Sequence, residues 1–159
     1  MTNTFFAGIM ALSLAAFVWA GTAAKEQKSW QVSPFLQIDA MNVPKRDGGT
    51  GLVTVVLNAK DAEWIGRICA MMPRIRDAVL RSASRYPVQM VRGTMIATEL
   101  ANDLPRAINA ALRDELIVAA KVFPGARDTG VTGGASKLPF ANSGCYSVPE
   151  ANFNTAGGR

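Results

Sequence analysis

Residues 52–79 read LVTVVLNAKDAEWIGRICAMMPRIRDAV and combine a short extended pattern with a longer helical one. The run at 52–57 is β-branched and almost wholly apolar, which is typical of a strand buried on both faces. After it, apolar side chains recur at steps of three and four residues, the spacing of a helix that packs one stripe against a core. The residues of this stripe are Ile65, Ile68, Met72, Ile75 and Val79. The stretch therefore predicts a buried strand followed by a core-facing helix.

Acidic and proline residues mark the ends of this helix and an interruption within it. Asp61 and Glu63 lie near its first turn, where negative charge is favourable. Pro73 falls inside the pattern and lacks an amide donor, so we expect the helix to kink or restart there. The pair Tyr86-Pro87 predicts its end.

The residues before the buried strand predict its partner. A strand is expected at 35–40, after Pro34, and a turn at 42–50, where NVPKRDGGT holds the strongest turn signal in the chain. Together with the run at 52–57, these segments predict an antiparallel hairpin.

The remaining chain predicts three further elements and a tail. A short strand is expected at 88–91, a helix from about residue 98, and a strand at 117–123, which Pro124 ends. The apolar stripe of that helix is Leu100, Leu104, Ile108, Ala111 and Leu112. Residues 125–159 are rich in glycine and have no period, which favours a disordered or loosely draped tail in which Phe140, Tyr146 and Phe153 can dock individually. The sequence thus predicts an α+β domain at 35–124, with two helices on one face of a small, mostly antiparallel sheet.

The first 24 residues carry no charged side chain and contain the apolar run FFAGIMALSLAAFVWA at 5–20. Its large apolar side chains are Phe5, Phe6, Ile9, Leu12, Leu14, Phe17, Val18 and Trp19. With the small residues that follow, the segment suits a membrane anchor of roughly 20 residues, and it equally suits a cleaved signal peptide; a buried helix of a soluble protein is the third interpretation. We expect either one N-terminal span of the inner membrane with a periplasmic domain, joined by a linker at 25–34, or a soluble periplasmic protein. The two lysines at 25 and 28 oppose this orientation under the positive-inside rule.

Composition narrows the function classes. The net charge of +5 favours binding to anionic lipid, to polyanions or to an acidic surface of a partner protein. Binding to nucleic acid is not expected, because the chain is predicted to be exported and has no cluster of basic residues interleaved with aromatic ones. The chain has no histidine, which removes Ser-His-Asp and Cys-His activation and imidazole metal ligands. The adjacent carboxylates Asp114-Glu115 are expected to be solvated. We therefore predict a non-enzymatic protein without cofactor or metal.

Cys69 and Cys145 are the two cysteines, and they lie 76 residues apart. In an oxidising compartment they can pair. Because Cys69 lies on the apolar stretch of the first helix, a buried free thiol is the favoured interpretation, and the disulfide is the alternative.

The segment at 72–80, MPRIRDAVL, resembles the flagellar basal-body-associated protein FliL family, and the likeness covers about residues 35–123. The family-like positions are Pro73, Ile75, Arg76, Asp77, Gly93, Leu100, Asn109 and Leu112. The resemblance implies a stomatin-like fold without catalysis. It also implies assembly into arcs or rings beside the stator units and basal body of the flagellar motor. The chain differs from the family pattern in its long tail and in having no basic residue before the apolar segment.

Five charged residues are the predicted partner-binding set: Arg67, Arg74, Arg76, Asp77 and Arg81. The arginines at 67, 74 and 81 recur every seven residues and are expected to share a face opposite the apolar stripe. Arg76 and Asp77 are neighbours that cannot face each other, so either the pair is solvated or one of them fixes a loop or a second subunit. The expected function is a motor accessory protein. The alternative is a secreted or periplasmic binding module unrelated to motility, with its signal removed and the tail folded over a ligand groove.

Overall fold

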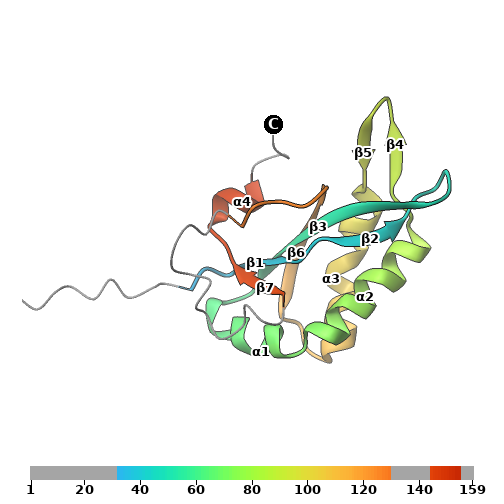
Figure 1. The fold of residues 1–159 in the computed structure, drawn as a ribbon. Helices are drawn as coiled ribbons and strands as arrows, with labels where there is room; N and C mark the ends of the chain where they lie inside the picture. The colour runs from blue at the N-terminus through green and yellow to red at the C-terminus, as the bar shows by residue number, and fades with distance from the viewer. Residues whose placement is uncertain (1–31, 130–143, 155–159) are drawn as a thin grey trace, which may run out of the picture. The chain divides into compact units, whose positions relative to one another are not determined.

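The computed structural model describes residues 32–129 and 144–154, which form an antiparallel sheet covered by helices (Figure 1). The central strand is β3 (Thr50–Ala59). Strands β1 (Phe35–Ile38) and β2 (Met41–Pro44) follow each other along one side of it, and β6 (Ile117–Pro124) lies along the other. A short strand, β7 (Cys145–Ser147), pairs with the outer side of β1. This confirms the predicted α+β class and the antiparallel sheet.

The predicted hairpin is present, and its first strand contains a bulge. Gln37 lies opposite Val56, whereas Met41 lies opposite Val53. Four steps along β1 and β2 therefore match three along β3, so one extra residue is accommodated at Asp39–Ala40. The turn is tighter than expected, because β2 uses the first residues of the predicted turn and the Lys45 amide donates to the Gly49 carbonyl at 3.1 Å.

The predicted long helix is divided in two. A 3-10 turn, η1 (Ala62–Trp64), is capped by the Asp61 carboxylate and leads into α1 (Ile65–Ala70). After a break at Met71, α2 (Met72–Arg85) begins with Pro73 in its first turn. A proline there removes no intrahelical hydrogen bond, so the helix restarts at this point, as one of the two expected outcomes. It ends directly before Tyr86-Pro87, as predicted.

A small hairpin lies between α2 and the next helix, and only the first of its two strands was predicted from the sequence. Strand β4 (Gln89–Val91) pairs with β5 (Thr94–Ile96) through a turn in which Arg92 and Gly93 have φ of 51° and 78°. The helix α3 (Thr98–Leu112) follows, close to its predicted start. The strand β5 was not predicted because it has only three residues and an Arg-Gly turn, not the Asn-Gly or Asp-Gly pair that signals such hairpins.

The core lies on both faces of β3. Val53, Val55 and Leu57 belong to the main cluster beneath α1, α2 and α3. On the opposite face, Val56 packs in a smaller cluster with Phe123, Val148 and Phe153, the last of these on α4 (Glu150–Asn154). The strand is therefore buried on both faces, as its apolar run predicted.

Residues 144–154 differ from the expected loose tail. They form β7 and α4, and a disulfide joins Cys145 of β7 to Cys69 of α1, with 5.7 Å between the Cα atoms. The expectation of a buried free thiol at Cys69 is therefore wrong, because the sulfur is bonded to Cys145; both cysteines are almost fully buried. The elements have only three and five residues, too few to give a periodic pattern. The disulfide and the smaller cluster hold them on the sheet.

Candidate protein-binding surface

The predicted arginine stripe is interrupted by the helix break. Arg67 belongs to α1, whereas Arg74 and Arg81 belong to α2. Because the backbone leaves the helical conformation at Met71, where φ is −100° and ψ is 19°, a seven-residue spacing across this point no longer places two side chains on one helix face. The expectation of one three-arginine face is therefore wrong, and only Arg74 and Arg81 remain on a common helix.

Two ion pairs engage three of the five predicted residues. Arg67 forms an ion pair with Asp114 at 3.1 Å and stacks over Trp64 at 5.5 Å from the ring centroid. Arg81 pairs with Asp77 one turn earlier on α2, at 2.7 Å. Both pairs are largely exposed, so they contribute little to stability.

Arg76 has a different role, because it connects α2 to the bulge of the first strand. Its guanidinium donates to the Asp39 carboxylate at 3.2 Å. The Asp39 amide in turn donates to the Gly144 carbonyl at 3.0 Å. A Cβ atom at residue 144 would displace the ends of both side chains, and the φ of 71° at this position also favours glycine. Arg76 thus contacts the segment between β1 and β2, in line with the interpretation that it holds a loop and not with the one that it is only solvated.

Tyr146 of β7 completes this exposed cluster. Its hydrogen bond to the Asp39 carboxylate, together with partial burial, raises the pKa of the phenol above its ordinary value. A neutral phenol can donate to the carboxylate, whereas a phenolate would repel it. The bulge therefore directs one carboxylate to both α2 and β7.

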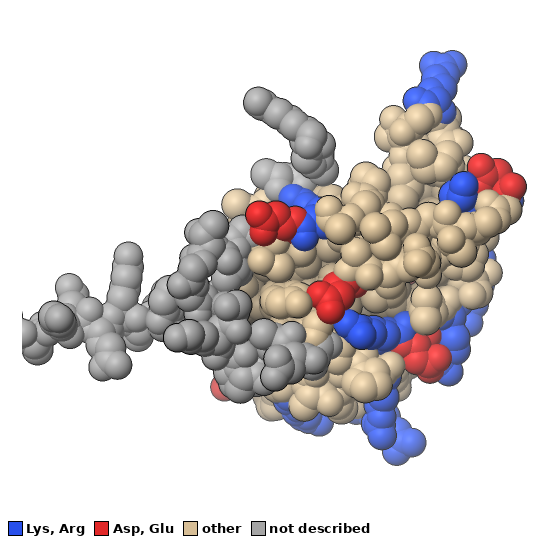
Figure 2. Space-filling model, viewed as in Figure 1, with Lys and Arg blue, Asp and Glu red and all other residues tan. Residues whose placement is uncertain are grey.

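The outward side of α2 next to this cluster forms a shallow hollow of about 400 Å³. It is lined by Met72, Pro73, Arg76, Asp77 and Leu80. Leu80, a large apolar side chain, is 42% exposed at this hollow. Arg74 follows Pro73 and is exposed; its amide donates to the Met71 carbonyl at 3.0 Å, while its side chain has no ion pair or hydrogen bond to the described part of the chain. We call Pro73, Arg74, Asp77 and Leu80 the α2 surface. Figure 2 shows basic and acidic side chains next to each other over the helices, so this is not a patch of one sign.

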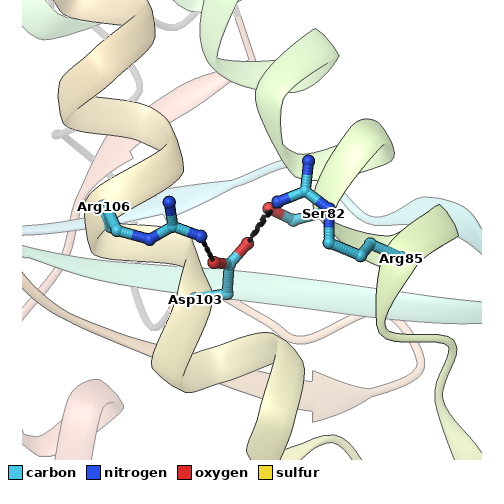
Figure 3. A network of polar contacts seen from close by, with 4 residues as sticks. All are labelled: Ser82, Arg85, Asp103 and Arg106. Atoms are coloured by element: carbon cyan, nitrogen blue, oxygen red, sulfur yellow. Dashed lines mark hydrogen bonds and ion pairs between the residues drawn. The ribbon is translucent and has the colours of Figure 1, made fainter.

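A buried network on the opposite side of α2 was not predicted (Figure 3). The Ser82 hydroxyl donates to Asp103 of α3 at 2.7 Å, Arg106 donates to the other carboxylate oxygen, and Arg85 lies 3.8 Å away. Burial alone would raise the pKa of Asp103, but these hydrogen bonds and positive charges outweigh it and hold the pKa below its usual value. The signal was present: Ser82 follows Val79 by three residues, so a polar side chain occupies the apolar stripe.

The family-like positions occupy structural sites. Ile75, Leu100 and Leu112 are buried in the main cluster. The Asn109 side chain accepts from the amides of Leu116 and Ile117 at 3.1 and 2.8 Å, and donates to the Ile117 carbonyl at 2.9 Å. Asn109 therefore fixes the end of α3 to the start of β6. Ile75, Leu100, Asn109 and Leu112 therefore support the fold, whereas the family-like residues Pro73 and Asp77 belong to the α2 surface.

The expected membrane segment at 1–24 lies outside the described residues, as does the linker expected at 25–34 except for its last three residues. Within the part that the structure covers, no helix combines the length and apolar character needed to cross a bilayer. The same part of the chain holds no group of three or more Cys, Asp or Glu side chains placed to bind a metal ion. Comparisons of the chain with protein-family models, with curated proteins and with solved structures found no match.

Proposed function

We propose that this chain is a non-enzymatic accessory protein that binds other proteins outside the cytosol through the α2 surface. The observation that carries the proposal is the contrast between the two sides of α2. One side is buried in the core and held to α3 by the Asp103 network. The other presents Leu80 and the unpaired Arg74 beside a hollow. A rigid helix with exposed apolar and charged groups loses little conformational freedom when it binds, which favours recognition.

The resemblance to the FliL family supplies the setting of this proposal. Its support is that Pro73, Ile75, Asn109 and the rest of the family-like set have consistent structural roles. The disulfide is further support, because such bonds persist in oxidising compartments. In this setting the protein is anchored in the inner membrane, self-associates into an arc or ring, and contacts stator and basal-body components of the flagellar motor.

A periplasmic or secreted binding module unrelated to motility is the second candidate. It is favoured by a groove of about 870 Å³ between β6, α3 and the β4–β5 hairpin. Intact mass of the mature protein separates the two candidates in part, since loss of the N-terminal apolar segment favours a free module and its retention favours an anchor.

The test places a photo-crosslinking amino acid at position 74 or 80 of the full chain in living cells. Lys60, an exposed residue at the far end of β3, is the matched control position. We expect crosslinks from positions 74 and 80, but not from 60, to a membrane-associated protein identified by mass spectrometry. Equal crosslinking from all three positions would contradict the α2 surface. Normal swimming under every load after gene deletion would contradict the motor setting while leaving the surface intact.

A further inference from the structure

The strand β6 has a free edge. It pairs with β3 along its whole length and with no second strand in the described part of the chain. The Gly125 amide donates to the Leu52 carbonyl at 2.8 Å, which sets the phase of the ladder. Because donors alternate along an antiparallel strand, the backbone groups of Ala120 and Val122 point away from β3. Pro124, in the same phase, has no amide, so this outward row of donors ends there.

The groove of about 870 Å³ lies along this edge. On the helical side of the sheet it is lined by apolar residues of the small hairpin and α3: Met90, Met95, Ile96, Ala97 and Ala101. On the other side it is lined by Lys121, Phe123 and Asn154, and Phe123 packs in the smaller cluster with α4. The lining therefore comes from both faces of the sheet around one edge. An added strand would place its alternate side chains in these two regions.

We infer that the β6 edge receives an extended segment of a partner protein as an additional strand. Main-chain hydrogen bonds to Ala120 and Val122 would supply affinity, and the two walls of the groove would select side chains. The exposed apolar side chains of the hairpin point to an apolar segment, since Met90 is 46% and Ile96 43% exposed and methionine adapts to varied shapes.

Charge narrows the partner further. Lys121 is the charged side chain among those lining the groove, where no acidic residue appears. Its ammonium group lies 4.6 Å from the centroid of the Phe153 ring, which holds it at the edge of the groove. The partner segment is therefore apolar with an acidic residue facing Lys121. None of the lining residues belongs to α2, so this inference does not depend on the α2 surface.

The test uses the full chain in detergent and fluorescent nine-residue peptides of alternating valine and threonine with a central glutamate. Two further peptides are N-methylated at one or the other alternate set of amides. We expect one of these to bind about tenfold more weakly than the parent and the other to bind unchanged, because only one set faces β6. Equal binding of both, or no peptide binding tighter than about 1 mM, would overturn the inference.

Variants of the protein give a second measurement. Ala120→Pro removes an outward amide without removing a bond to β3, so peptide binding should fall about tenfold while thermal unfolding shows a folded protein. Lys121→Glu should weaken binding of the peptide with a central glutamate. It should strengthen binding of the same peptide with a central lysine in place of that glutamate. Lys60→Glu, the same change of charge at an exposed position outside the groove, is the control and should change the binding of neither peptide. If the chain is instead a dimer that Ala120→Pro makes monomeric, a second copy occupies the edge and the partner strand is excluded.

Discussion

Two carboxylates connect α2 to the rest of the domain, and their surroundings differ sharply. The side chain of Asp103 is 6% exposed and has Ser82, Arg85 and Arg106 around it, whereas that of Asp39 is 48% exposed. Removing a partner from a buried charge leaves other polar groups unsatisfied at a cost of several kcal/mol, whereas an exposed pair contributes about 0–1 kcal/mol. The energy of such a connection thus depends on burial more than on residue type.

The largest effect on stability is expected from removing the disulfide, which holds β7 next to the exposed carboxylate of Asp39. The disulfide of Cys145 fixes β7, which carries Tyr146 beside Asp39. In the double variant Cys69→Ala, Cys145→Ala, the free energy of unfolding should fall by about 4 kcal/mol, because the unfolded chain loses a long closed loop. Urea unfolding measures this change. Reductant should destabilise the parent protein and leave the double variant unchanged; a variant as stable as the parent would show that β7 is held without the bond.

Breaking the buried network should have the next largest effect. Asp103→Ala leaves the buried Ser82 hydroxyl without its acceptor, whereas the Arg85 and Arg106 side chains are 59% and 73% exposed and stay solvated, so stability should fall by about 2 kcal/mol. Asp39→Ala, which removes the exposed carboxylate, is the matched control and should cost less than about 1 kcal/mol. Urea unfolding of the two variants compares them directly. Equal losses would show that the burial difference does not set their energies.

The pH dependence of stability sharpens the same comparison. The pKa of Asp103 is lower in the folded state than its unfolded value of about 3.9. Its contribution is therefore complete above about pH 4 and is lost as the pH falls through the folded pKa. The stability difference between the parent and Asp103→Asn should shrink over this acid range. A difference that stays constant down to about pH 2 would contradict the ionised network.

The smallest effect is expected at Tyr146. Its pKa is raised in the folded state, so its contribution is present below the unfolded value of about 10 and is lost as the pH rises through the folded pKa. In a Tyr86→Phe background Tyr146 is the only tyrosine, and tyrosinate absorbance follows its titration. Asp39→Ala should move this titration to lower pH; an unchanged curve would show that another group holds the proton.

Elements with a long pattern could be predicted from the sequence, and contacts between distant residues could not. The run at 52–57, the restart at Pro73 and the hairpin were recoverable because each rests on local chemistry. The strands β5 and β7 were too short to show a period. The partner of Arg76 lies 37 residues away, on a bulge that no local signal marks. The predicted common face of Arg67, Arg74 and Arg81 was wrong because it extended a regular helical spacing across the break at Met71.

The bulge at Asp39–Ala40 also decides which side chains of the first strand lie inside. Leu36 and Ile38 have even numbers and Val43 an odd one, yet all three are fully buried in the same cluster. The extra residue makes this change of parity permissible. Deleting one amino acid here would therefore reverse which side chains of one half of the strand face the core. Either Val43 or the pair Leu36 and Ile38 would become exposed.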